Sequence, residues 1–161
     1  AFHQKVETAV NQNGGVLTTF LGDGAMAVFG LPEPRADDPV RALNAAHALV
    51  RDIDAWAPLR IGVGIHYGPV TIAQLGGRDQ RQISATGDTV NLASRLESQT
   101  RPHDALIAVS ASVIEAVRAL DRDDLVAAFH HAAREQVKGR REAVDVWILP
   151  ATTGDAKRGV A

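Results

Sequence analysis

Three polar residues, Asn91, Arg95 and Ser98, recur at intervals of four and three residues in the segment TGDTVNLASRLESQT, residues 86–100. In an α-helix this spacing places them on one face, and apolar residues occupy the opposite side. A solvated helix surface is one explanation of such a stripe. The other is a substrate site, in which Asn91 orients the substrate and the planar guanidinium of Arg95 binds phosphate oxygens. Both interpretations remain open on spacing alone.

Asp23 is a second candidate, because it stands between Gly22 and Gly24 within TTFLGDGAMAVFG, residues 18–30. Two apolar runs flank this acid, so a tight hairpin turn is sufficient to explain it. No lysine or arginine lies closer along the chain than Arg35, which leaves the carboxylate without a local counter-charge. The functional alternative is a ligand for Mg²⁺, which prefers hard oxygen donors and keeps substrate phosphates in its coordination shell.

Lys138 lies in the basic segment VKGRR and is a third candidate. A solvated turn explains it, and so does a point charge that holds a terminal phosphate. Other chemistries are not indicated. The segment GGRDQ lacks the spacing of a phosphate-binding loop, and the histidines do not cluster as metal ligands.

Hydrophobic periodicity predicts the elements that position these residues. The helices are expected from Phe2 to Gly14-Gly15, from Asp38 to about Trp56, over 86–100 and from Ser110. The strands are expected as a hairpin over 16–20 and 25–29, a hairpin over 59–68 and 69–75, a short strand over 81–85, a strand over 105–109, and an antiparallel pair over 125–132 and 143–149. Asp38, Asp88 or Thr86, and Ser110 are the expected N-caps.

The segment LRIGVGIHYG, residues 59–68, alternates bulky residues with a nearly bare face that contains three glycines. A bare strand face lets a helix or a second backbone approach closely. Because helices and strands interleave and several neighbouring strands are antiparallel, we predict an α+β fold, with helices packed on a mixed, mainly antiparallel sheet.

Composition sets limits on the function. The chain has 161 residues, 45% of them hydrophobic, which suits one domain, and its net charge of −2 gives no reason to expect a nucleic acid partner. It contains no cysteine, no apolar run long enough to span a membrane and no recognisable signal peptide. These features are compatible with a reducing compartment, and we expect a cytoplasmic protein.

Four stretches together resemble the class III nucleotide cyclase catalytic domain: GGVLTTFLGDGAMAVFG, LRIGVGIHYGPV, TGDTVNLASRLE and VKG…VDVWIL. They occur in the family's order and at roughly its spacing. The resemblance implies a ferredoxin-like palm and a catalytic domain over residues 1–150, followed by a tail, residues 151–161, that we expect to be disordered. It also implies the reaction: the ribose 3′-hydroxyl of a nucleoside triphosphate attacks the α-phosphorus and expels pyrophosphate.

The resemblance also assigns roles to the candidates. Asp23 matches the second of two aspartates that bind two Mg²⁺ or Mn²⁺ ions, and Asn91 matches the residue that positions the ribose. Arg95 matches the arginine that stabilises charge on the transferring phosphoryl group, and Lys138 matches the lysine on the terminal phosphates. Family members are dimers with the site between subunits, so a homodimer with two equivalent sites is expected.

Two positions that read the base depart from the family pattern. Thr19 stands where adenylate cyclases usually carry lysine and guanylate cyclases carry glutamate, and Ser84 stands where adenylate cyclases usually carry aspartate or threonine. Hydroxyl groups can donate or accept hydrogen bonds, so this pair does not decide between ATP and GTP. The likeness of Ser84 to the threonine variant favours ATP.

The first metal aspartate of the family belongs to a strand-and-helix unit at the start of the domain. This chain opens in the helix before GGVLTTF, so we expect a truncated domain that is inactive by itself and, in the full-length chain, is joined to regulatory domains. The alternative is a catalytically inactive cyclase-homology module for dimerisation or nucleotide sensing. A diguanylate cyclase or polymerase palm ranks lower, because LGDGAM holds a single acid.

Overall fold

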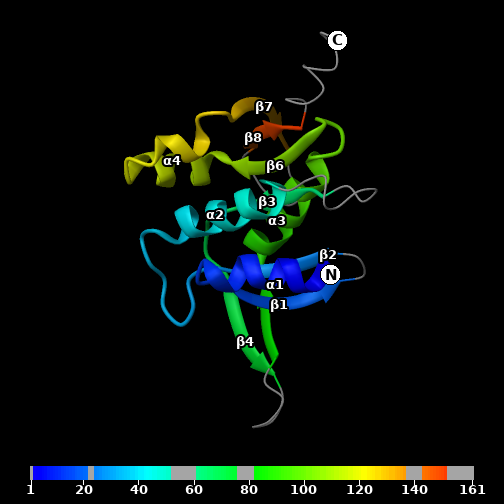
Figure 1. Cartoon of the computed structure of the whole chain (residues 1–161), viewed down its shortest axis with the longest axis vertical. Helices are drawn as coiled ribbons and strands as arrows, with labels where there is room; N and C mark the ends of the chain where they lie inside the picture. The colour runs from blue at the N-terminus through cyan, green and yellow to red at the C-terminus, as the bar shows by residue number, and fades with distance from the viewer. Residues whose placement is uncertain (1, 22–23, 52–60, 76–81, 137–142, 152–161) are drawn as a thin grey trace.

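The chain folds into interleaved helices and strands, and a computed structural model describes residues 2–21, 24–51, 61–75, 82–136 and 143–151 (Figure 1). The elements are α1 (Phe2–Gln12), β1 (Val16–Leu21), β2 (Gly24–Val28), α2 (Asp38–Arg51), β3 (Val63–Ile65), β4 (Thr71–Leu75), β5 (Gln82–Thr86), α3 (Asp88–Gln99), β6 (Ala105–Ser110), α4 (Ala111–Ala119), the 3₁₀ helix η2 (Asp123–Val126), β7 (His130–Glu135) and β8 (Val144–Pro150). No described helix is long and apolar enough to cross a membrane.

A four-stranded sheet in the order β3-β6-β8-β7 forms the centre of the fold. Strand β3 pairs with β6 in parallel, whereas β8 pairs antiparallel with both β6 and β7. Two further antiparallel pairs, β1-β2 and β4-β5, complete the described strands. The predicted α+β class, with helices on a mixed and mainly antiparallel sheet, is confirmed.

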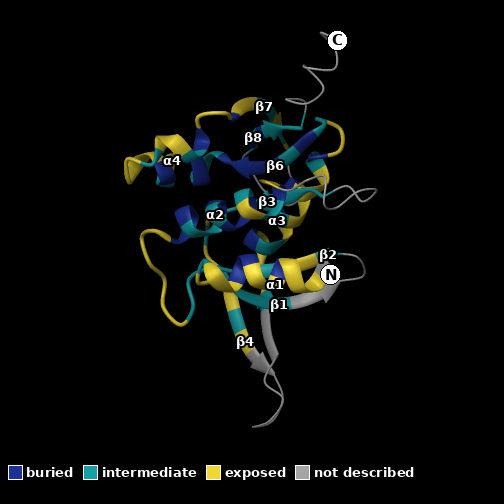
Figure 2. Ribbon diagram, viewed as in Figure 1, coloured by how far each residue is buried: buried dark blue, intermediate teal, exposed yellow. Residues whose placement is uncertain are grey.

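Each face of this sheet has its own apolar core. On one face, Leu92 and Leu96 of α3 pack against Ala108 of β6 and Val146 of β8. On the other face, α2 and α4 pack against Ile107 and Val109 of β6. Figure 2 shows the buried residues concentrated around β6, while much of α1 is exposed. Burial on both faces explains why β6 is an almost continuous apolar run.

The predicted hairpin over 59–68 and 69–75 is wrong. Strand β3 pairs with β6, and β4 pairs instead with β5, from Thr71 opposite Thr86 to Leu75 opposite Gln82. Pro69 lies between β3 and β4 and has no N–H for a ladder hydrogen bond. Alternation therefore located the apolar residues but could not identify the partner strand. The first two residues of the predicted strand, 59–60, lie outside the described residues.

The predicted helix caps are also wrong in detail. Helix α3 follows Gly87, and no side chain caps its first turn. Ser110 does occupy the N-cap position of α4, but its hydroxyl makes no cap hydrogen bond. The end of α1 is as expected, since Gly14 has a φ of 79° and the Gly15 N–H donates to the Val10 carbonyl at 2.9 Å.

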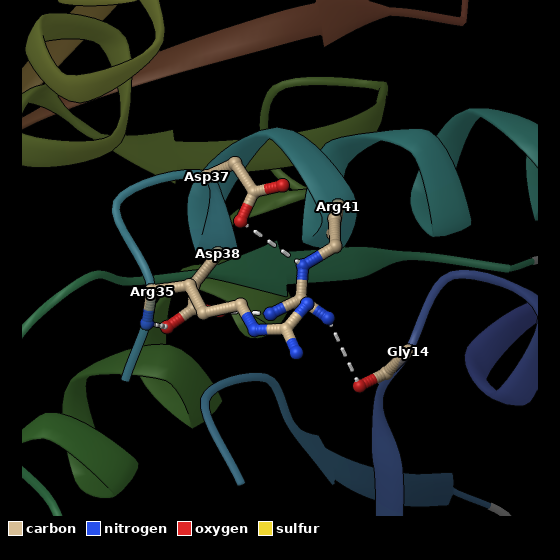
Figure 3. A network of polar contacts seen from close by, with 5 residues as sticks. All are labelled: Gly14, Arg35, Asp37, Asp38 and Arg41. Carbon is tan, nitrogen blue, oxygen red and sulfur yellow. Dashed lines mark hydrogen bonds and ion pairs between the residues drawn. The ribbon is translucent and has the colours of Figure 1, made fainter. Parts of the chain in front are cut away.

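A polar network at the start of α2 joins this helix to the end of α1 (Figure 3). The buried Asp38 carboxylate accepts from the Arg35 N–H at 2.8 Å and forms an ion pair with Arg41. Arg41 also donates to the Gly14 carbonyl at 3.2 Å and lies 3.4 Å from the exposed Asp37. Asp38 thus holds the preceding loop instead of capping the helix, and Arg41 fixes the residue that leads into β1.

Replacing Arg41 with methionine should destabilise the fold. Methionine keeps much of the side-chain volume but leaves the buried Asp38 carboxylate without its cationic partner, which should cost about 1–3 kcal/mol. Asp37→Asn is the matched control, because that side chain is exposed and its pairing is worth about 0–1 kcal/mol. Urea unfolding measures both variants, and an Arg41→Met protein as stable as Asp37→Asn would contradict this account.

Candidate functional site

Helix α3 lies directly against the bare face of β3, the face that the sequence predicted a helix or a second backbone could approach closely. A β-carbon on Gly64 would lie 2.5 Å from the Ala93 carbonyl oxygen and 2.9 Å from Glu97 Cα, so only glycine admits the helix at this distance. Leu92 and Leu96 are buried beneath the helix. The opposite side of α3 is consequently turned towards solvent.

The predicted polar stripe is confirmed as that solvent side, because Asn91, Arg95 and Ser98 are all exposed. Ser98 Oγ donates to the Ser94 carbonyl at 3.2 Å, within its own helix. Within the described part of the chain, neither Asn91 nor Arg95 has a side-chain hydrogen bond or ion pair. Asn91 and Arg95 therefore lie on the solvent side of a helix whose other side packs against β3. No other described side chain holds them in place.

The two predicted base-reading residues lie on neighbouring strands. Thr19 belongs to β1, opposite Met26, and Ser84 belongs to β5, opposite Ala73. Strands β1 and β5 contact each other, and β5 also contacts α3, which begins two residues after it ends. Thr19, Ser84, Asn91 and Arg95 thus lie on β1, β5 and α3. Strand β5 contacts both β1 and α3.

Asp23 and Lys138 lie outside the described residues. Asp23 falls between Leu21 and Gly24, which pair with each other at the ends of β1 and β2, and Lys138 falls between β7 and β8. The described residues contain no group of three histidine, cysteine or acidic side chains that could hold a metal. Asp23 is the one metal ligand that the sequence predicts here, and its carboxylate is the kind of hard oxygen donor that Mg²⁺ and Mn²⁺ prefer.

A hydrogen-bond network at the end of β3 was not predicted. His66 Nδ1 lies 2.7 Å from Ser110 Oγ, which lies 2.8 Å from Ser112 Oγ, and Ser112 Oγ lies 3.1 Å from the Tyr67 carbonyl oxygen. We name these residues, His66, Ser110 and Ser112, the serine relay. The sequence carries one signal for it, two serines at the end of a buried strand. That signal becomes informative only once β3 is known to pair with β6.

A cleft of about 660 Å³ lies between α1, α2 and η2. Its lining includes Asn13, Asn44, His47 and Arg51, and it does not include Asn91 or Arg95, the predicted catalytic residues that the structure describes. Asp124 also lines the cleft and accepts hydrogen bonds from Arg122, which hold the pKa of that carboxyl below its usual value. The cleft therefore shares no lining residue with the described catalytic candidates, Asn91 and Arg95.

The matching family model and the similar proteins all point to the same family. A model described as the adenylate and guanylate cyclase catalytic domain matches residues 1–150. "Adenylate cyclase, terminal-differentiation specific" from Dictyostelium discoideum is 29% identical over 149 residues, which is 86% of this chain and only 7% of that protein.

Solved structures agree on the fold. The adenylyl cyclase CyaB from P. aeruginosa has a TM-score of 0.72 at 23% identity, over 92% of this chain and 78% of that one. The guanylyl cyclase Cya2 has a TM-score of 0.67 at 26% identity, over 92% of this chain and 76% of that one. The solved structures similar to this chain therefore include both an adenylyl cyclase and a guanylyl cyclase.

Proposed function

The chain belongs to the family of adenylate and guanylate cyclase catalytic domains, and we propose that it forms cyclic AMP and pyrophosphate from ATP. One observation carries this proposal beyond membership of the family. The positions matched to base, ribose and phosphate recognition, Thr19, Ser84, Asn91 and Arg95, lie on β1, β5 and α3, which contact one another in series. A chain that had kept only the fold would have no need of polar residues at all four positions.

Each residue has a separate task in the proposed reaction. Asn91 orients the ribose so that the 3′-oxygen faces the α-phosphorus. This preorganisation lowers the entropic cost of aligning the reacting atoms. Arg95 holds the phosphoryl oxygens as charge redistributes during the displacement. Lys138 binds the terminal phosphates that leave as pyrophosphate. The exposure of Asn91 and Arg95 supports these tasks, because both side chains can reach a ligand outside their own subunit.

Asp23 is the residue that would hold the divalent cations, Mg²⁺ or Mn²⁺, two to a site. When bound, these ions lower the pKa of the 3′-hydroxyl and neutralise phosphate charge. A single carboxylate is an incomplete ligand set for them. We therefore propose that a second acidic ligand, on a strand outside residues 1–161, completes the set. The separation of β1-β2 from the four-stranded sheet among the described residues supports that proposal, since a further strand would join them.

The catalytic unit is proposed to be a homodimer. One subunit supplies the metal ligands, and its partner supplies Asn91, Arg95 and Lys138, so that a two-fold axis generates two sites. This chain spans only 7% of the Dictyostelium relative. By analogy with that longer protein, residues 1–150 are proposed to be one domain of a cytoplasmic signalling protein that carries regulatory domains. The expected disorder of residues 151–161 remains a prediction, because 152–161 lie outside the described residues.

The test is turnover by the full-length protein. We expect cyclic AMP from ATP with Mn²⁺, a slower conversion of GTP, and no product from residues 1–161 alone. Liquid chromatography of the products separates cyclic AMP from cyclic GMP. Cyclic GMP as the main product would move the assignment to guanylate cyclase, and no cyclic nucleotide from either substrate would favour the alternative, an inactive dimerisation or nucleotide-sensing module.

A further inference from the structure

The two strands of the β1-β2 hairpin are not matched residue for residue. Leu17 lies opposite Ala27. The next pair joins Thr19 to Met26, so β1 uses two residues where β2 uses one. This count defines a β-bulge, and Thr18 is its extra residue. The Thr18 hydroxyl donates to the Met26 carbonyl oxygen at 3.1 Å, a direction that is fixed because a carbonyl oxygen can only accept.

The bulge decides which face of the hairpin each later residue of β1 occupies. Opposite residues of an antiparallel pair share a face, and neighbours along a strand alternate between faces. Thr19 therefore belongs to the face of Met26, and Ala25 belongs to the other face. A ladder continued from Leu17 without the extra residue would place Thr18 opposite Met26. Thr19 would then lie on the face of Ala25.

The closing turn depends on the same extra residue. Leu21 pairs with Gly24, which leaves two residues, Gly22 and Asp23, between the strands. Two-residue loops are the commonest hairpin connections. A ladder without the bulge would bring Leu21 opposite Asp23 and leave Gly22 alone, which is too little chain for a hairpin loop. The bulge therefore sets the register of the whole tip of the hairpin.

The stem of the hairpin is held independently of its tip. Where the chain enters β1, Arg41 donates to the Gly14 carbonyl at 3.2 Å (Figure 3). Where it leaves β2, a β-carbon on Gly30 would lie 2.9 Å from Asp38 Oδ2. Asp38 is only 5% exposed and is the ion-pair partner of Arg41. Because this buried pair contacts both ends of the stem, a change of register should appear at the tip.

We propose that the bulge at Thr18 sets the register of the β1-β2 hairpin and makes Thr18 a positioning residue for base recognition. In a continuous ladder the Thr18 side chain would stand perpendicular to the sheet, away from the Met26 carbonyl, so its hydrogen bond stabilises the bulged register. Thr18 itself contacts no part of the nucleotide. The consequence for ATP and GTP rests on the proposed function, because it requires Thr19 to contact the base.

Cysteine pairs in the full-length protein test the register directly. Thr19→Cys with Met26→Cys should form a disulfide under mild oxidation, because directly opposite residues have Cα atoms close enough for one. Thr19→Cys with Ala25→Cys should not, since these positions belong to opposite faces. Peptide mass spectrometry identifies the bridge, and residues 1–161 contain no cysteine of their own. Cross-linking to position 25 in preference to position 26 would overturn the proposal.

Two replacements of Thr18 test the positioning role. Thr18→Val keeps the branched shape and the strand propensity but loses the hydroxyl, whereas Thr18→Ser keeps the hydroxyl. The ratio of kcat/KM for ATP to kcat/KM for GTP should fall about fivefold in Thr18→Val, the change in an equilibrium that one net hydrogen bond represents. In Thr18→Ser the ratio should stay nearly unchanged. A merely structural role would lower both rates together and leave the ratio as it was.

An unchanged ratio in a folded Thr18→Val protein would overturn the positioning role. If the unmodified protein converts neither nucleotide, the proposed function fails, while the cysteine pairs still decide the register. The two failures are therefore distinguishable.

Discussion

Replacing Arg95 with alanine is expected to lower kcat of the full-length protein about 10²–10³-fold, the usual cost of removing one preorganised donor at a developing charge. Arg95 is exposed on α3 and has no described side-chain partner, so its loss should not disturb the fold. The free energy of unfolding should stay within about 0.5 kcal/mol of the unmodified value. Steady-state kinetics and urea unfolding of the same preparation measure the two quantities.

Arg101→Ala is the matched control for this experiment. Arg101 is also exposed and follows α3 in the turn before β6, so the substitution removes the same charge near the same helix. It should leave kcat nearly unchanged. Arg95→Lys should give an intermediate rate, because lysine keeps the charge but lacks the planar fork that binds two oxygens. A normal rate for Arg95→Ala would remove this residue from the proposed mechanism.

Local patterns predicted the part of the site that lies on one element. The spacing of Asn91 and Arg95 against Leu92 and Leu96 requires only the 3.6-residue period of a helix, and the exposure of the first pair and burial of the second confirm it. The glycine face of residues 59–68 was likewise visible, because glycine leaves a recognisable gap in an alternating strand. Such features depend on neighbours in the sequence.

Long-range pairing was not predictable in the same way. Strand β3 pairs with β6, more than forty residues further along the chain, and nothing in the alternation of 59–68 identifies that partner. The same limit concealed the serine relay, because His66 and Ser110 meet only after β3 and β6 align. Ser110 shows a second limit, since a residue can occupy the expected cap position and use its hydroxyl elsewhere.

The residues that complete the proposed site come from separate chain segments and, in the proposed homodimer, from two subunits. Thr19 and Ser84 lie on strands that are distant in sequence, and their strands meet through the contact of β1 with β5. Asp23 and Lys138 lie outside the described residues, so their roles stay predictions from the family resemblance. Asp23 is therefore predicted as one part of the proposed site, and the described residues of one chain do not complete that site.

Replacing Gly64 with alanine should give the largest loss of stability among single methyl additions on β3. The new β-carbon would meet the Ala93 carbonyl oxygen at 2.5 Å and Glu97 Cα at 2.9 Å, and both atoms belong to the backbone of α3. Backbone atoms of α3 cannot move aside as a side chain can by changing its rotamer, so the whole helix must shift to admit the new β-carbon. We expect a loss of about 3 kcal/mol and a Tm lower by about 6–12 °C, measured by calorimetry.

Gly62→Ala is the control that separates a backbone obstacle from a side-chain obstacle. Its β-carbon would meet mainly the Thr100 side chain, so the double change Gly62→Ala with Thr100→Ala should recover part of the lost stability. No side-chain truncation should rescue Gly64→Ala, because the obstacle is helix backbone. The folded fraction of the Gly64→Ala protein should also have a lower kcat, because displacement of α3 moves Asn91 and Arg95. An unchanged Tm for Gly64→Ala would contradict the close packing of α3 on β3, and with it the placement of both site residues.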